Sequence, residues 1–293
     1  MFEGVYTALI TPFKDGKIDM ASIESIIEMQ ISGGIDGVVP VGTTGESPTI
    51  SFEEHEKLVS EVVRMVRGRV KVIAGTGANS TAEAVHLSKS AADAGVDGVL
   101  QVNPYYNKPP QQGLIAHFEK VANSISVPVV LYNIPGRTGV NFLPESVKEL
   151  LGRTDNIAAM KEASGDLGQM IRLIELCGDK ISVLSGDDNL FLPLLSVGGK
   201  GLVSVLSNIM PAEVKKVYEL FTTGKMNEAS SHFAKLIPLC RALFVETNPI
   251  PIKAIMAMAG YCSNEIRLPL VELDAKKKED VKKLFKEYGV NLK

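Results

Sequence analysis

Short apolar runs alternate with amphipathic segments over most of this chain, and this pattern restricts the chain to few architectures. The runs expected to be strands are Val5–Ile10, Gly37–Val41, Val70–Ala74, Gly98–Val102, Val129–Tyr132, Ile157–Met160, Ser182–Leu184 and Gly201–Val205. Several of them are apolar throughout and do not alternate with polar residues. Continuous apolar runs are typical of strands that are buried on both faces of a parallel sheet.

Each run is followed by a segment in which apolar residues recur with helical spacing. The expected helices are Met20–Ser32, Ser51–Met65, Ser80–Ala94, Gln111–Ser124, Pro144–Leu151, Asp166–Leu176, Asn189–Val197 and Pro211–Thr222. Ser51 with Glu54, and Ser80 with Glu83, have the spacing of a capping box at a helix start. Eight strand–helix units in roughly 220 residues predict a (β/α)8 TIM barrel.

A doubly wound open sheet is the alternative to the barrel. Such a sheet usually has fewer strands and a glycine-rich phosphate turn after the first one. Here the first run is followed by Thr11-Pro12-Phe13. The barrel is therefore the preferred prediction.

Beyond Gly224 the strand pattern stops. The remaining segments with helical spacing are Lys225–Phe244, Pro249–Ala259 and Asp274–Tyr288. We predict a catalytic barrel over residues 1–224 and a C-terminal helical domain over residues 225–293.

Composition and motif content argue against several classes of function. Lys and Arg number 31 against 34 Asp and Glu, and this balance does not suit a general nucleic-acid binder. No apolar run reaches the ~18 residues of a membrane span, and Met1–Pro12 lacks the basic start of a signal peptide. Cys177, Cys240 and Cys262 have neither disulfide nor zinc spacing, so we expect reduced thiols in a cytoplasmic protein. Metal-ligand and nucleotide-binding motifs are absent, and no cofactor is expected.

The active site of such a barrel forms at the C-terminal ends of its strands. Lys161 directly follows the run Ile157–Met160, where it could point into the barrel mouth or extend to solvent. A buried lysine favours the free amine, which can attack a ketone. An exposed lysine would only cover apolar surface with its stem.

Other strand ends carry groups that suit a small carboxylate. Thr43 and Thr44 lie between glycines and offer hydroxyl and backbone N–H groups, although an ordinary turn has the same composition. Arg137 follows Tyr132 in a glycine-flanked turn. Its guanidinium can bind a carboxylate through two hydrogen bonds, or it can simply be a surface arginine.

Tyr105 and Tyr106 follow the run Gly98–Val102 in a proline-rich loop. On pattern alone they indicate a packing or subunit contact as readily as a site. All histidines fall within expected helices. Proton transfer would therefore use tyrosine and threonine hydroxyls and water.

Together these motifs resemble those of the dihydrodipicolinate synthase family, a branch of the class I pyruvate aldolase superfamily that includes N-acetylneuraminate lyase. The resemblance extends from Phe2 to Leu270. It is carried by Gly42-Thr43-Thr44-Gly45-Glu46, Pro104-Tyr105-Tyr106-Asn107, Tyr132-Asn133-Ile134-Pro135-Gly136-Arg137-Thr138-Gly139, Lys161-Glu162-Ala163, Ser185-Gly186-Asp187-Asp188 and Glu246-Thr247-Asn248-Pro249-Ile250-Pro251-Ile252-Lys253.

The resemblance implies a Schiff-base condensation of pyruvate with L-aspartate 4-semialdehyde, the first committed step of lysine biosynthesis through diaminopimelate, without a metal or organic cofactor. It implies that Lys161 forms the Schiff base, and that Tyr132, Thr43 and Tyr106 form a hydroxyl relay, with Tyr106 supplied across a tight dimer. It further implies that the substrates are bound by Thr44 at the pyruvate carboxylate, Arg137 at the semialdehyde carboxylate, and Gly186 and Val203 at the pyruvate end.

The resemblance also implies a homotetramer of two tight dimers, and inhibition by L-lysine at the dimer interface. The positions that match this inhibitory site are Ser47, Phe52, His55, Asn79, Glu83 and Tyr105. Pro48 and Phe52 depart from the pattern of many regulated relatives.

Two other functions are considered. One is a lyase that acts on a sialic acid or another sugar-derived 2-oxo acid, and Arg137 argues against it because it suits a short aldehyde that bears a carboxylate. The other is a catalytically silent metabolite sensor, which would need a change at Lys161, Tyr132 or Thr43.

Overall fold

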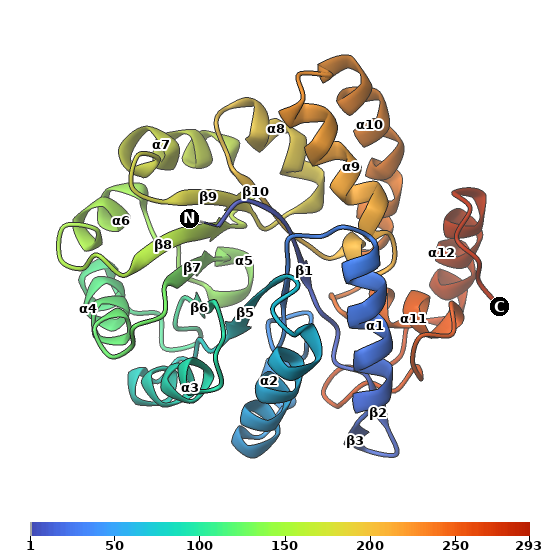
Figure 1. The fold of residues 1–293 in the computed structure, drawn as a ribbon, viewed down its shortest axis with the longest axis horizontal. Coiled ribbons are helices and arrows are strands. Elements are labelled where there is room, and N and C mark those ends of the chain that lie inside the picture. Colours follow the sequence, from blue (N-terminus) through green and yellow to red (C-terminus); the bar gives the residue numbers. More distant parts are fainter. Residues whose placement is uncertain (1) are drawn as a thin grey trace.

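The computed structural model describes residues 2–293, which form a closed barrel of parallel strands surrounded by helices (Figure 1). The barrel strands are β1 (Gly4–Ala8), β4 (Gly37–Val39), β5 (Lys71–Gly75), β6 (Gly98–Val102), β7 (Val129–Asn133), β8 (Ile157–Glu162), β9 (Ser182–Ser185) and β10 (Gly201–Ser204). Successive barrel strands pair with each other, and β10 pairs with β1 to close the ring. The predicted (β/α)8 barrel is confirmed.

The helices that surround the barrel follow the predicted order. They are α1 (Met20–Ser32), α2 (Phe52–Val66), α3 (Thr81–Asp93), α4 (Gln111–Ala122), α6 (Pro144–Leu150), α7 (Leu167–Cys177), α8 (Phe191–Ser196) and α9 (Pro211–Thr222). Ser51 and Glu54 form the predicted capping box. Ser80 caps α3, but among residues 2–293 no bond returns from its N–H to the Glu83 carboxylate, so the second capping box is wrong.

Short elements account for the main differences from the prediction. A hairpin of β2 (Phe13–Lys14) and β3 (Lys17–Ile18) follows β1, and one helical turn, α5 (Pro135–Thr138), follows β7. Elements of two to four residues are too short to show a hydrophobic period. The sixth barrel strand also continues past the predicted Ile157–Met160, because its two charged residues are buried and remain in register with β7.

The alternating side chains of the strands divide the apolar core in two. Inward-facing residues fill the barrel interior: Tyr6, Ala8, Val39, Ile73, Leu100, Val130, Ala159, Leu184 and Val203. A larger cluster lies between the strands and the outer helices. Lys161 is the next inward position after Ala159 on β8. The reactive groups can therefore lie only at the barrel mouth, above a packed interior.

Helices α10 (Met226–Ala242), α11 (Ile250–Met258) and α12 (Ala275–Glu287) follow the barrel, as expected (Figure 1). Leu236, Ile252 and Phe285 from these helices belong to the same apolar cluster as the outer face of the barrel. The division of the chain at residue 224 stays a prediction. Among residues 2–293, no helix is long and apolar enough to span a membrane.

Candidate active site

The amine of Lys161 lies at the mouth of the barrel, on β8. The residue is 6% exposed, and its Nζ lies 4.0 Å from the centroid of the Tyr132 ring. Tyr132 is its register partner on β7. The ion-paired lysines among residues 2–293 are Lys215, Lys253 and Lys277. Of the two orientations that the sequence left open, Lys161 therefore has the one that points into the barrel, and it has no counter-ion there among the described residues.

Gly186 leaves room for this amine. A Cβ atom at Gly186 would lie 3.1 Å from Lys161 Cε and 2.5 Å from Ala163 Cβ, so a larger residue would press on the lysine. Asp187 follows, and burial raises the pKa of its carboxyl while the Lys161 charge opposes that shift. Val203 is 1% exposed and packs in the barrel interior.

The strands that carry Tyr132 and Lys161 are joined one position further along by Asn133 and Glu162. Glu162 is fully buried, and its two oxygens accept hydrogen bonds of 3.1 and 3.0 Å from Asn133 Nδ2 and one of 2.7 Å from Ser164 N–H. Burial raises the pKa of the Glu162 carboxyl. These bonds fix Tyr132 relative to Lys161. Sequence reasoning missed both residues, although each directly follows a residue that it singled out.

The loop that carries Thr43 and Thr44 is held from the C-terminal part of the chain. Asn248 Nδ2 donates a 3.0 Å hydrogen bond to Thr44 Oγ1. Glu46 has a positive φ of 59°, a conformation that costs free energy in a non-glycine residue. Its carboxylate pairs with Lys253 Nζ at 2.5 Å, and both side chains are 1% exposed. The loop is thus held at two points, by α11 (Ile250–Met258) and by the segment that leads into it.

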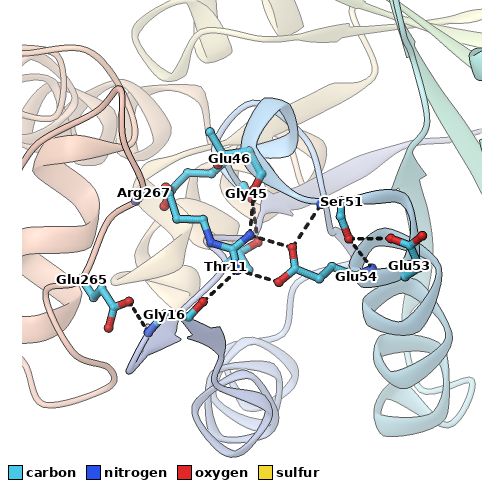
Figure 2. A network of polar contacts seen from close by, with 10 residues as sticks. Thr11, Gly16, Gly45, Glu46, Ser51, Glu53, Glu54, Glu265 and Arg267 are labelled. Atoms are coloured by element: carbon cyan, nitrogen blue, oxygen red, sulfur yellow. Dashed lines mark hydrogen bonds and ion pairs between the residues drawn. The ribbon is translucent and has the colours of Figure 1, made fainter.

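Arg267 extends this attachment (Figure 2). Its backbone N–H donates to Glu46 at 3.1 Å, and its guanidinium binds Glu54 and the Thr49 carbonyl. The guanidinium also lies 4.3 Å from the centre of the Phe13 ring. We call Glu46, Lys253, Arg267 and Glu54 the C-terminal clamp. Sequence reasoning gave Glu54 only a capping role and gave the other three residues no role. The only signal was that Glu46 and Lys253 belong to two of the motifs that carry the resemblance.

A cavity of about 380 Å³ lies beside this loop. It is lined by residues predicted for the substrate site and for the inhibitory site together: Thr43, Ser47, Phe52, His55, Glu83, Tyr105 and Arg137. Lys161, Asn79 and Tyr106 are not part of its lining. Arg137, which is exposed, donates a 3.0 Å hydrogen bond from Nη2 to the Asn248 carbonyl.

His55 reaches this cavity from α2. Its Nε2 lies 2.7 Å from the Gly75 carbonyl at the end of β5, so this nitrogen carries the hydrogen. Its Nδ1 is buried and has no partner among residues 2–293. Burial lowers the pKa of His55. Nδ1 is therefore a hydrogen-bond acceptor that is buried, unpaired among the described residues and not exposed to the cavity.

Tyr106 is separate within this chain from Thr43 and Tyr132, the other residues predicted for the hydroxyl relay. It is 90% exposed and has a positive φ of 73°. Among residues 2–293, no hydrogen bond joins it to Thr43 or Tyr132. One chain alone does not assemble the three hydroxyls.

The chain is similar over its whole length to proteins of one known family. A model of the dihydrodipicolinate synthetase family matches residues 1–288. The chain belongs to this family. The 4-hydroxy-tetrahydrodipicolinate synthase of Leptospira biflexa serovar Patoc is 54% identical over 99% of this chain and 100% of its own length. That of Syntrophus aciditrophicus is 50% identical over 99% of both chains.

A solved structure agrees with the sequence comparisons. Dihydrodipicolinate synthase from Aquifex aeolicus has a TM-score of 0.98 and 43% identity, with 100% of both chains covered. The family that the motifs indicated is confirmed. The chain is an enzyme of this family, a lyase with the activity for which these relatives are named.

Proposed function

We propose that this dihydrodipicolinate synthetase family member condenses pyruvate with L-aspartate 4-semialdehyde through a Schiff base on Lys161. The observation that carries the proposal is a buried amine without an ion pair, at the barrel mouth and 4.0 Å from the Tyr132 ring. A relative from Acinetobacter baumannii, with 39% identity, 99% of this chain and 100% of its own covered, and a TM-score of 0.96, was solved in complex with pyruvate.

The amine of Lys161 attacks the ketone carbon of pyruvate, and loss of water gives an imine. The protonated imine withdraws electrons, so the pyruvate methyl group loses a proton and becomes an enamine carbon. That carbon forms a bond with the aldehyde carbon of the second substrate. The amino group of the second substrate then attacks the imine carbon and releases Lys161.

The other residues bind the substrates and move protons. Tyr132, Thr43 and Tyr106 transfer protons through their hydroxyls, with Tyr106 supplied by the partner subunit of a tight dimer. The exposure of Tyr106 and its separation from Thr43 within one chain support this arrangement. The substrate-binding groups are Thr44 for the pyruvate carboxylate, Arg137 for the semialdehyde carboxylate, and Gly186 and Val203 at the pyruvate end. Two tight dimers form a homotetramer in the cytoplasm.

The experiment that tests the substrates compares aldehyde acceptors with pyruvate as the common donor. L-aspartate 4-semialdehyde should be the preferred acceptor, and N-acetylmannosamine should react far more slowly. Arg137→Ala should damage use of the semialdehyde while the pyruvate imine still forms, because only the second substrate meets the guanidinium. Preference for N-acetylmannosamine would indicate a sialic acid lyase instead.

L-Lysine is the inhibitor we propose for the cavity beside the Thr43 loop. Glu83 lines the cavity and offers a carboxylate to an ammonium group, and His55 belongs to the same lining. Tyr105 lies on the same lining, and Asn79 completes the proposed site from outside it. A relative from Cyanidioschyzon merolae, 42% identical over 99% of both chains with a TM-score of 0.96, was solved with lysine bound.

A titration of initial rates with L-lysine tests this site. At millimolar L-lysine the inhibition should be partial to strong, which is the extent expected for a coupling of about 1–3 kcal/mol between the two sites. Glu83→Ala should abolish it. Inhibition that survives in Glu83→Ala would place the inhibitor elsewhere. Unchanged wild-type rates at tens of millimolar, a rough ceiling for a weak site, would show that no such regulation exists.

A further inference from the structure

Asn248 contacts both residues that are proposed to bind substrate carboxylates. It lies in the segment that leads into α11 and is 5% exposed. Its side-chain Nδ2 donates to Thr44 Oγ1 at 3.0 Å, and its backbone carbonyl accepts from Arg137 Nη2 at 3.0 Å. The contact with Thr44 uses the side chain and the contact with Arg137 uses the backbone. A substitution at Asn248 can therefore remove the first contact and leave the second.

The direction of the contact with Thr44 decides what Thr44 can do. A threonine hydroxyl has one hydrogen to donate and two lone pairs that accept. Because Asn248 donates to Oγ1, it occupies a lone pair and leaves the hydroxyl hydrogen for another acceptor. Among residues 2–293, the Thr44 hydroxyl donates to no other group. The carboxylate of pyruvate is an acceptor of this kind.

We propose that Asn248 is a positioning residue that orients the Thr44 hydroxyl so that it donates to the pyruvate carboxylate. This inference rests on the proposed role of Thr44. The bond to Thr44 is the one hydrogen bond of the Asn248 side chain among residues 2–293, because its Oδ1 is buried and has no partner there. The ion pair of Lys253 with Glu46 holds α11 against the same loop, two residues beyond Thr44.

Two single variants test the direction of the hydrogen bond. Asn248→Ala removes the donor but keeps the backbone carbonyl for Arg137, so the KM for pyruvate should rise about tenfold, as for one lost hydrogen bond. The KM for the semialdehyde should stay within about twofold. Asn248→Asp has nearly the same shape but presents only acceptors when ionised. It should capture the Thr44 hydrogen and raise the pyruvate KM further.

A merely structural role would raise both KM values together or lower thermal stability in proportion to the kinetic effect, and either result overturns the proposal. If Asn248→Ala does not fold, Asn248→Asp decides, because it preserves the volume of the side chain. An unchanged pyruvate KM in Asn248→Asp would also overturn the proposal.

The double variant shows whether Asn248 acts through Thr44. Thr44→Val alone should raise the pyruvate KM, and adding Asn248→Ala to it should change that KM by less than about twofold. A full additional rise would mean that Asn248 acts through another group, and only the present inference would fail. If Thr44→Val itself leaves the pyruvate KM unchanged, the proposed role of Thr44 fails, and the inference fails with it.

Discussion

Two buried lysines of this enzyme have similar surroundings but different partners. Lys161 is 6% exposed and Lys253 is 1% exposed, and their amines lie 4.0 and 4.3 Å from the centres of the Tyr132 and Phe13 rings. Lys253 pairs with the Glu46 carboxylate at 2.5 Å, whereas Lys161 has no ion pair among residues 2–293. Burial lowers the pKa of Lys253, and Glu46 opposes that shift.

Under the proposed role of Lys161, the difference means that burial alone does not make a lysine reactive. Lys253 holds a loop in place because its charge is compensated by a carboxylate that is equally buried. Lys161 has no such ion pair among residues 2–293, and Gly186 leaves space beside its Cε. In the proposed mechanism, the missing counter-ion is what leaves the buried amine of Lys161 free to act as a nucleophile. The predictions below test this distinction.

The largest expected effect is on turnover. Lys161→Arg keeps a positive charge but has no amine that can form an imine, so turnover should fall by a factor on the order of a thousand or more. Lys253→Arg is the matched control, because it keeps a cation opposite Glu46. It should retain at least about a tenth of the wild-type rate. Similar losses in the two variants, measured as kcat, would contradict the distinction.

The free energy of unfolding should depend more on Lys253 than on Lys161. Lys253→Met leaves the Glu46 carboxylate buried without a partner and should lower the free energy of unfolding by about 3–5 kcal/mol. Lys161→Met should change it by less than about 1 kcal/mol, because no partner is left unpaired. Urea unfolding curves measure both. The double variant Glu46→Gln with Lys253→Met should recover part of the loss, and a further loss would show that the pair is not the cause.

His117 is a second buried base without an ion pair among residues 2–293. Its Nδ1 lies 2.9 Å from Thr81 Oγ1, and burial lowers its pKa from 6.5 to about 4. The unfolded chain therefore takes up this proton first as the pH falls. Neutral, buried His117 therefore contributes about 3 kcal/mol to the free energy of unfolding. This contribution is complete above pH 6.5 and is lost as the pH falls to 4.

His117→Gln removes this titrating group and tests the effect. The difference in unfolding free energy between the variant and the wild type, measured at several pH values, should shift in favour of the variant as the pH falls from 6.5 to 4. A difference that does not depend on pH would mean that His117 titrates normally in the folded enzyme.

The smallest expected effect is at the outer part of the C-terminal clamp. Arg267 pairs with Glu54 where the side chains are 20% and 32% exposed, and it lowers the pKa of Glu54 below the ordinary 4.5. The contribution of this ion pair to the free energy of unfolding is therefore present above pH 4.5 and is lost at lower pH. Glu54→Gln should cost less than about 1 kcal/mol at neutral pH. A loss as large as that of Lys253→Met would mean that exposure does not distinguish the two pairs.

The barrel could be predicted from the sequence because each apolar run and each helix produces its own local pattern. The hairpin at Phe13–Ile18 and the turn that holds Arg137 are too short for such a pattern. The end of β8 was placed too early, because Lys161 and Glu162 are charged residues that only the folded barrel buries. Local charge is a poor guide where a strand reaches a functional site.

The candidate site could be located in part, because Lys161 lies near the end of β8, and Thr43 and Arg137 lie in the segments that follow β4 and β7. The contacts that hold the site were not predicted. Asn248 and Thr44 are 204 positions apart, and Lys253 and Glu46 are 207 apart. Spacing in the sequence carries no information on pairs of this kind, since the barrel and α11 must fold before these pairs meet.

The most direct test of the central claim is to trap the pyruvate adduct. Wild-type enzyme is incubated with pyruvate and borohydride, digested, and mapped by mass spectrometry. The account predicts one stoichiometric adduct on the peptide that contains Lys161, and none on the peptide that contains Lys253. An adduct on Lys253, or full trapping in a Lys161→Ala variant, would contradict the claim that the missing counter-ion selects the reactive lysine.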